Sequence, residues 1–224
     1  MSVYISFDVE TNGDTPMLND MLSIGMVAIT AEGEIVWKYE TGFEPLEGHS
    51  SMEQVMNFWM SPKQADAWQK VQSLPKISPL EFYTTVSDAL TTLSQTYTIE
   101  FVAWPANFDW MFFKCYYELG RKQALKSAYG TSSATGFNIS YECNDASELF
   151  SAFKLVNRIT DKSVANRIKG QLMAKDESLA HDGLYDAICQ GLFYIRLLKM
   201  LDTCSPRTPI EDQVAVGLSL YTKE

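Results

Sequence analysis

Four carboxylates in this 224-residue sequence stand in largely apolar segments, and one of the chain's two histidines lies close to the last of them. These residues are Asp8, Glu10, Asp109, His181 and Asp186. An unpaired charge is costly to bury, so each carboxylate needs a partner, a proton or a cation. Carboxylate oxygens suit hard cations such as Mg²⁺ and Mn²⁺, and an imidazole that titrates near neutral pH can accept a proton.

The first two acids lie one residue apart in FDVETNG, residues 7–13. In a strand, side chains two apart point to the same face, so Asp8 and Glu10 lie side by side. Two carboxylates so close repel each other unless a cation lies between them or one takes a proton. DxE also occurs by chance in many proteins, so this pair alone does not establish a metal site.

The later residues have structural explanations as well. Asp109, in WPANFDWMFF, can stabilise the start of a helix through the helix dipole. Asp186, in HDGLYDAICQGLFYI, is too deep in its predicted helix to be a cap, and a neutral buried carboxyl is the alternative to a ligand role. His181 precedes that helix, where a loop can turn its ring toward Asp186. His49, in the loop LEGHSS, is expected to point at solvent.

The elements that position these residues are indicated by the spacing of apolar side chains. Strands are predicted at residues 3–10, 21–30, 34–43, 98–104 and 138–143, and Glu32-Gly33 reads as a hairpin turn. Helices are predicted at residues 52–60, 80–93, 108–125, 145–156 and 183–201, with Asn107 as the cap of the third. Strands first, then strands interleaved with helices, predict an α/β fold: a mixed sheet with antiparallel opening strands, flanked by helices.

Length favours one large domain, which we place at residues 1–204. The tail, residues 205–224, contains QVAVGLSLY, whose alternating apolar residues are typical of a strand. It could add an edge strand, contact a partner or pack loosely, and the sequence does not choose among these.

The charge is distributed unevenly along the chain, whose net charge is −10. Residues 1–113 hold 4 Lys and Arg against 15 Asp and Glu, whereas residues 114–224 hold 14 against 13. Such an acidic chain is not expected to hold long duplex nucleic acid through bulk charge. Residues 150–175 are locally basic, with six Lys and Arg against the single acid Asp161. Both a basic groove and a solvated helix or loop face account for this window.

Four widely spaced cysteines without a CxxC motif indicate neither a zinc site nor a disulfide framework. Reduced thiols are typical of an intracellular protein. The chain also lacks a run of about 18 apolar residues, the length needed to span a membrane, and its first residues do not resemble a signal peptide. We therefore expect a soluble cytoplasmic protein.

In chain order the residues read DxE, D and HxxxxD, with 99 residues from Glu10 to Asp109 and 77 from Asp109 to Asp186. This pattern resembles the DEDDh branch of the DnaQ-like 3′-to-5′ exonuclease superfamily, which includes oligoribonuclease, ribonuclease T and proofreading domains. FDVETNG matches the first motif, NFD the second and HDGLYDA the third, so the resemblance spans residues 3 to about 200. FWMSPKQADAW, residues 58–68, also resembles a segment of phage-type and related bacterial exonucleases.

The resemblance implies a ribonuclease H-like fold in which four carboxylates hold two divalent cations, Mg²⁺ or Mn²⁺. These metal ligands would be Asp8, Glu10, Asp109 and Asp186. The cations would activate a water and stabilise the leaving 3′ oxygen, and His181 would be the general base. The implied activity is release of nucleoside 5′-monophosphates from single-stranded or short RNA or DNA, beginning at the 3′ end.

Substrate contacts are less clearly indicated by the sequence. The residues predicted to touch the strand are Thr11, Asn12, Trp59, Trp104, Asn107 and Phe108. The aromatic ones could stack on bases or simply belong to the core. The family's second motif commonly reads HNxxFD, whereas here Asn107 directly precedes Phe108, a departure that bears on Asn107 as a contact.

A catalytically inactive nucleic-acid or protein-binding module on the same fold is the alternative function. The sequence does not distinguish RNA from DNA or single strands from duplex, and it leaves the biological pathway and a homo-oligomeric state open.

Overall fold

The computed structural model describes residues 1–127, 136–140, 142–173, 176, 179 and 181–204. Its strands are β1 (Ser2–Thr11), β2 (Met21–Thr30), β3 (Ile35–Phe43), β4 (Lys76–Ile77), β5 (Thr98–Ala103) and β6 (Asn144–Asp145). Its helices are α1 (Glu53–Trp59), α2 (Ala65–Ser73), α3 (Pro79–Ser94), α4 (Ala106–Ser127), α5 (Ala146–Val156), α6 (Lys162–Met173) and α7 (Gly183–Cys204), with a short 3₁₀ helix, η1 (Pro62–Gln64). No helix among the described residues combines the length and apolarity that crossing a bilayer requires.

The six strands form one mixed sheet in the order β4-β3-β2-β1-β5-β6. The first three strands pair antiparallel, and β1 pairs parallel with β5 on its other side. The pairing of β1 with β5 ends at Ser6 and Val102, so residues 7–11 of β1 extend beyond that partner. The predicted mixed sheet with antiparallel opening strands is confirmed, and it leaves the end of β1 open along one edge.

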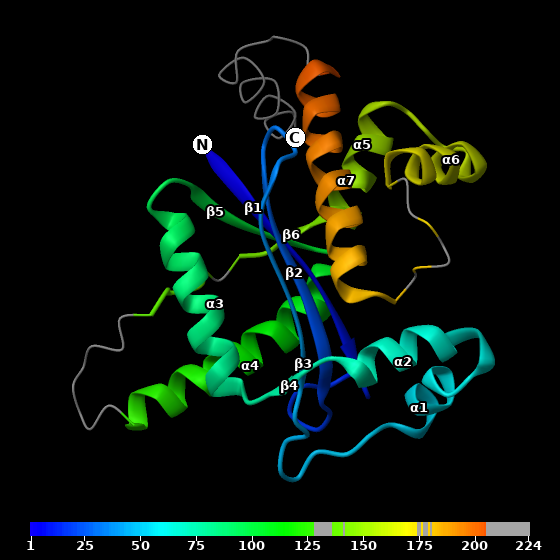
Figure 1. The fold of residues 1–224 in the computed structure, drawn as a ribbon. Coiled ribbons are helices and arrows are strands. Elements are labelled where there is room, and N and C mark those ends of the chain that lie inside the picture. Colours follow the sequence, from blue (N-terminus) through cyan, green and yellow to red (C-terminus); the bar gives the residue numbers. More distant parts are fainter. Residues whose placement is uncertain (128–135, 141, 174–175, 177–178, 180, 205–224) are drawn as a thin grey trace, which may run out of the picture.

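Helices cover both faces of the sheet (Figure 1). The odd-numbered residues of β1 from Val3 to Val9 belong to a core that includes aromatic side chains of α3 and α4. Tyr4 belongs to a second core, built with α5 and α7. Since side chains alternate along a strand, Asp8 and Glu10 lie on the α7 face.

Local hydrogen bonds explain where several helices start. At α3, the Ser78 hydroxyl accepts the backbone N–H of Glu81, whose carboxylate in turn accepts the Ser78 N–H. Asp145 caps α5 by accepting the backbone N–H groups of Ser147 and Glu148. Asp161, directly before α6, accepts N–H groups in the same way. These caps fix the starts of the helices that surround the sheet.

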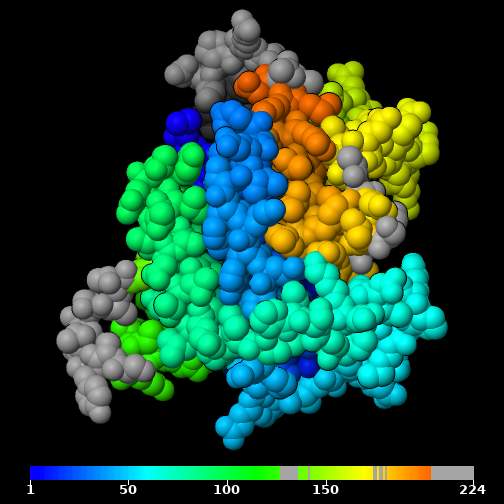
Figure 2. All heavy atoms as spheres, in the orientation of Figure 1, coloured from blue at the N-terminus to red at the C-terminus, as the bar shows by residue number. Residues whose placement is uncertain are grey.

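The short helices α1 and α2 lie across the lower end of the molecule, below α7 (Figure 2). The buried indole N–H of Trp59 donates to the Thr11 carbonyl at the end of β1, at 3.0 Å. Lys70 on α2 forms ion pairs with Glu40 of β3, at 2.9 Å, and with Asp182 just before α7. Both helices are thereby joined to the end of the sheet that carries Glu10.

Some local predictions are wrong. Helix α4 begins at Ala106, so Asn107 lies inside it and is not its cap. The strand expected at residues 138–143 is absent from the described residues of that range, and β6 comprises only Asn144 and Asp145. His49 does not face solvent, because its Nδ1 lies 3.1 Å from Asp20 Oδ1 and its side chain is 13% exposed. Helix α2 and strand β4 are short elements that the apolar spacing did not indicate.

The predicted strand in the tail lies outside the described residues, and the domain boundary after residue 204 stays a prediction. Cys115 and Cys143 are free thiols in the described part of the chain.

Candidate active site

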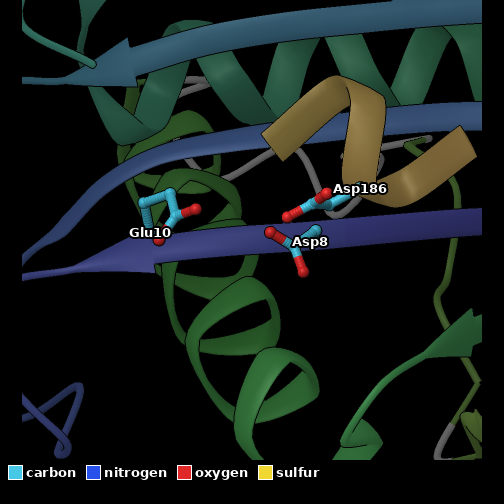
Figure 3. A group of neighbouring side chains, drawn as sticks. All are labelled: Asp8, Glu10 and Asp186. Atoms are coloured by element: carbon cyan, nitrogen blue, oxygen red, sulfur yellow. The ribbon is translucent and has the colours of Figure 1, made fainter. Parts of the chain in front are cut away.

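Three of the predicted ligands meet where β1 faces the first turn of α7. The carboxylates of Asp8, Glu10 and Asp186 each offer an oxygen, and these oxygens lie within 4.8 Å of one another. Figure 3 shows Asp8 and Glu10 on the same strand, with Asp186 opposite Asp8 on the helix. Glu10 is buried, and the two aspartates are partly exposed. Three negative groups this close repel one another, so the cluster suits a divalent cation.

Glycines allow α7 to approach the sheet closely enough to form this cluster. Gly25 of β2 is the register partner of Asp8, and a Cβ on Gly25 would lie 2.1 Å from the backbone nitrogen of Leu184. Gly183, the first residue of α7, packs from the other side, because a Cβ there would lie 3.2 Å from the Gly25 nitrogen. Backbone therefore lies directly on backbone at this point, and Asp186 is brought over β1.

His181 lies beside the cluster in a constrained conformation. Its φ of 65° is in the left-handed region, which non-glycine residues rarely adopt. Its backbone N–H donates to Asp186 Oδ2 at 3.1 Å, and its ring Nδ1 lies 3.8 Å from Glu10 Oε1. The ring makes edge contacts with Phe58 and Trp59, at centroid distances of 5.2 and 6.0 Å. The imidazole is thus held near the carboxylates while 38% of its side chain stays exposed.

The contact between His181 and Asp186 corrects one expectation. Although Asp186 is the fourth residue of α7, its carboxylate reaches back and accepts an N–H from the residue two before the helix. Asp186 therefore takes part in the helix start as well as in the carboxylate cluster.

Asp109, the fourth predicted ligand, is not a member of the three-carboxylate cluster. It is 3% exposed, and its carboxylate accepts the backbone N–H groups of Val9 and Trp104. Its Oδ2 is buried without a hydrogen-bond partner. Burial raises the pKa of this carboxyl to about 8, despite the two N–H groups that lower it. A buried carboxylate oxygen left in this way fits the binding of a cation, which would favour the charged form.

Sequence reasoning missed Asp145, which lies near Asp109. Its Oδ2 accepts the backbone N–H of Ala106 at 3.0 Å, so one carboxylate joins the starts of α4 and α5. Its negative charge also contributes to the raised pKa of Asp109. The sequence signal was an aspartate at the first residue of a helix predicted at residues 145–156, a position close to that of a cap.

A cavity of about 480 Å³ opens beside the cluster. Asp8 and Asp186 line it, together with Trp104 at the end of β5 and Lys169 on α6. Gln190, one turn after Asp186, also lines it and donates from Nε2 to the Phe7 carbonyl at 2.5 Å. The carboxylates therefore border a space with both a cation and an aromatic ring in its wall.

Of the six predicted substrate contacts, all of them described, Trp104 is the one that lines this cavity. Trp59 is 2% exposed and donates its indole N–H to Thr11. Thr11 and Asn12 are buried, with side chains that hydrogen-bond within the protein.

Phe108 packs against the core that includes the odd-numbered residues of β1, and Asn107 is exposed. A role in substrate binding stays a prediction for each of the six.

Solved structures that this chain resembles include 3′ exonucleases and an RNase domain. The nuclease domain of 3′hExo, a DEDDh family member bound to rAMP, matches with a TM-score of 0.53 and 12% identity, over 92% of this chain and 95% of that one. The RNase domain of yeast Pop2 matches with a TM-score of 0.56 and 12% identity, over 88% and 77%. E. coli Exonuclease I in complex with a dT13 oligonucleotide matches with a TM-score of 0.55 and 12% identity, over 92% of this chain but 42% of that one.

The chain therefore has the mixed α/β fold of the DEDDh exonucleases. No protein-family model and no curated protein matches its sequence. At identities this low the structural likeness shows the fold, and the activity has to be argued from the site itself.

Proposed function

We propose that this protein is a metal-dependent 3′-to-5′ exonuclease that hydrolyses phosphodiester bonds of single-stranded or short nucleic acid. The observation that carries the proposal is the carboxylate cluster of Asp8, Glu10 and Asp186, with oxygens within 4.8 Å of one another on a fold shared with 3′ exonucleases. The products would be nucleoside 5′-monophosphates.

The donor set supports binding of Mg²⁺ or Mn²⁺. Asp8, Glu10 and Asp186 would hold one cation, and Asp109, with its buried oxygen, would contribute to a second. Bound divalent cations would polarise the phosphate and stabilise the charge on the leaving 3′ oxygen. All four ligands offer oxygen atoms only, the donor type that these hard cations prefer.

We assign to His181 the removal of a proton from the attacking water. Its side chain is 38% exposed to solvent beside the carboxylate cluster, and the edge contacts with Phe58 and Trp59 restrict its ring. The ring Nδ1 of His181 lies 3.8 Å from Glu10 Oε1, so the imidazole is close to the proposed metal ligands. His181 is therefore the proposed general base, and the carboxylates are the proposed metal ligands.

The decisive experiment uses single-stranded RNA and DNA oligomers labelled at either end, incubated with Mg²⁺ or Mn²⁺. We expect a 3′ label to appear at once in mononucleotides, and a 5′ label to move through a ladder of shortening products. Asp8→Asn should abolish release, and without added metal it should melt at a temperature no lower than the parent, whereas Asp66→Asn, which changes an exposed acid on α2, should leave the rate unaltered.

Retarded but uncut strands would instead favour a binding module, and release beginning at the 5′ end would contradict the assigned polarity. Cation binding can be measured separately. A hundredfold excess of Mn²⁺ over its dissociation constant should stabilise the fold by about 2.7 kcal/mol.

A further inference from the structure

One face of α6 carries a row of two lysines, an asparagine and a methionine. Lys162, Asn166, Lys169 and Met173 follow one another at intervals of four, three and four residues, so they lie along one side of the helix. Lys169 and Asn166 line the cavity that contains Asp8 and Asp186. The row therefore begins in the candidate active site and leads away from it.

A second cavity, of about 380 Å³, adjoins the first at Asn166. It lies between α5 and α6, with Lys154 of α5 and Lys162 of α6 in its wall, and Asn166 lines both cavities. We call the two cavities together the α6 groove. Yellow α6 stands beside α7 at the periphery of the molecule, where a strand can reach it (Figures 1 and 2).

Each cavity places an ammonium group over an aromatic ring. Lys169 Nζ lies 4.2 Å from the centroid of Trp104, and Lys154 Nζ lies 5.2 Å from that of Phe150. Contacts of this type hold a flexible lysine side chain in one direction. The two cations are thus fixed at separate places along the groove, as binding of successive phosphates requires.

Asp8 and Asp186 line the first cavity, and the acid in the wall of the second, Asp161, does not offset Lys154 and Lys162 fully. Its Oδ1 accepts hydrogen bonds from the hydroxyl and the backbone N–H of Ser163, both at 2.7 Å, and from the Val164 N–H at 3.4 Å. These hydrogen bonds hold the pKa of Asp161 below its usual value, so it stays an anion, but one bound to the start of α6. The positive end of the helix dipole lies at the same place.

We propose that the α6 groove binds the nucleotides on the 5′ side of the cleaved bond, so that the preferred substrate is a single strand several nucleotides long. This inference rests on the proposed exonuclease function. Lys162 and Lys169 are seven residues apart, or about 10 Å along the helix. At about 3.4 Å per stacked nucleotide, this interval corresponds to roughly three nucleotides. The groove would therefore distinguish strands by their length and by their phosphates, and not by their base sequence.

The test compares a dinucleotide with a 12-nucleotide single strand as substrates of the double variant Lys154→Ala/Lys162→Ala. The dinucleotide ends before these lysines, so its kcat/KM should not change. On the 12-mer, kcat/KM should fall roughly tenfold. The slope of log affinity against log salt should also decrease by about 1.4, because each phosphate contact contributes about 0.7 on single strands.

Arg167→Ala is the matched control. Arg167 is an exposed cation on the same helix, and it lies about 140° around the axis from Lys162, away from both cavities. Arg167→Ala should leave kcat/KM unchanged on both the dinucleotide and the 12-mer. An equal loss with Arg167→Ala would show a general charge effect and overturn the groove. So would a double variant that digests the 12-mer at the parental rate, or one that loses the dinucleotide equally.

Failure of the proposed function gives a different result. If the unaltered protein cleaves neither substrate, fluorescence anisotropy with the labelled 12-mer tests the groove by itself. We expect roughly tenfold weaker binding for the double variant and parental binding for Arg167→Ala. Equal binding by all three proteins would refute the groove whether or not the protein is a nuclease.

Discussion

Replacing Gly25 with alanine should damage the proposed metal site without changing any of the proposed ligands. The new Cβ would lie 2.1 Å from the Leu184 nitrogen, and it would have to recede to at least 3.0 Å, a shift of 0.9 Å. The atoms that this Cβ would meet belong to the backbone of Gly183 and Leu184, so no side chain can rotate away. The start of α7 must therefore move, and Asp186 moves with it.

A shift of this size exceeds the tolerance of a metal site, whose ligand distances hold to about 0.2 Å. We expect Mn²⁺ affinity to fall by about ten- to a hundredfold, and the rate of nucleotide release by about a hundredfold. Overpacking should also cost about 1–3 kcal/mol of unfolding free energy. Titration calorimetry with Mn²⁺, the oligomer assay and thermal melting measure the three effects.

Gly42→Ala is the control, because it adds the same methyl group to the same sheet. Its Cβ would meet the far end of the Lys76 side chain, at 2.6 Å from Nζ, and this side chain can move. Gly42→Ala should therefore keep parental Mn²⁺ affinity and rate. If Gly25→Ala also keeps both, the close approach of α7 to β2 does not position Asp186 and our reasoning is wrong.

Two further predictions concern residues that support the site. Asp145→Ala should lower the free energy of unfolding at pH 7 by about 1–2 kcal/mol through loss of the α5 cap. Burial raises the pKa of Asp145, but hydrogen bonds from Ser147, Ala106 and Glu148 outweigh burial and lower the pKa below its usual value of 3.8. The stabilisation is therefore fully present above pH 3.8 and is lost as the pH falls through the folded-state pKa. In urea denaturation, the free energies of unfolding of the parent and of Asp145→Ala should therefore converge in strong acid. A difference between them that widens in acid would contradict this prediction. Trp59→Phe should cost about 1–3 kcal/mol in the same assay by leaving the Thr11 carbonyl buried and unsatisfied, whereas Trp68→Phe, in the ring 5.6 Å away, should cost less.

The sequence predicted the parts of this fold that depend on regular apolar spacing. Strand β1 alternates along its length, and this alternation alone is enough to place Asp8 and Glu10 on one face. Helix α7 is predicted for the same reason, and Asp186 with it. The meeting of the two elements is not predictable from spacing, because it depends on Gly25 and Gly183, whose small size matters only once they face each other.

Other errors arose where a tertiary contact decides the local structure. His49 lies in a polar loop, as a solvent-exposed histidine would, and only the fold brings it to Asp20. Trp59 is a different case: its role in substrate binding stays a prediction, but its indole N–H has a buried acceptor at the end of β1 that its own segment did not indicate. A side chain's polar partner across the fold leaves no signal in its own neighbourhood of the sequence.

Asp109 lies where the pairing of β1 with β5 has ended, and it has both a hydrogen-bonding role there and a proposed metal role. Phe7 and Val9 lie two apart on β1, beyond the last pair with β5, so their backbone groups on that edge lack a strand partner. Gln190 donates to the Phe7 carbonyl, and Asp109 accepts the Val9 N–H. Polar side chains are thus needed inside the fold where the ladder ends, directly beside the carboxylate cluster. An asparagine at residue 109 could keep the N–H contacts and lose only the charge, so Asp109→Asn separates its structural role from its proposed metal role, whereas Asp109→Ala removes both.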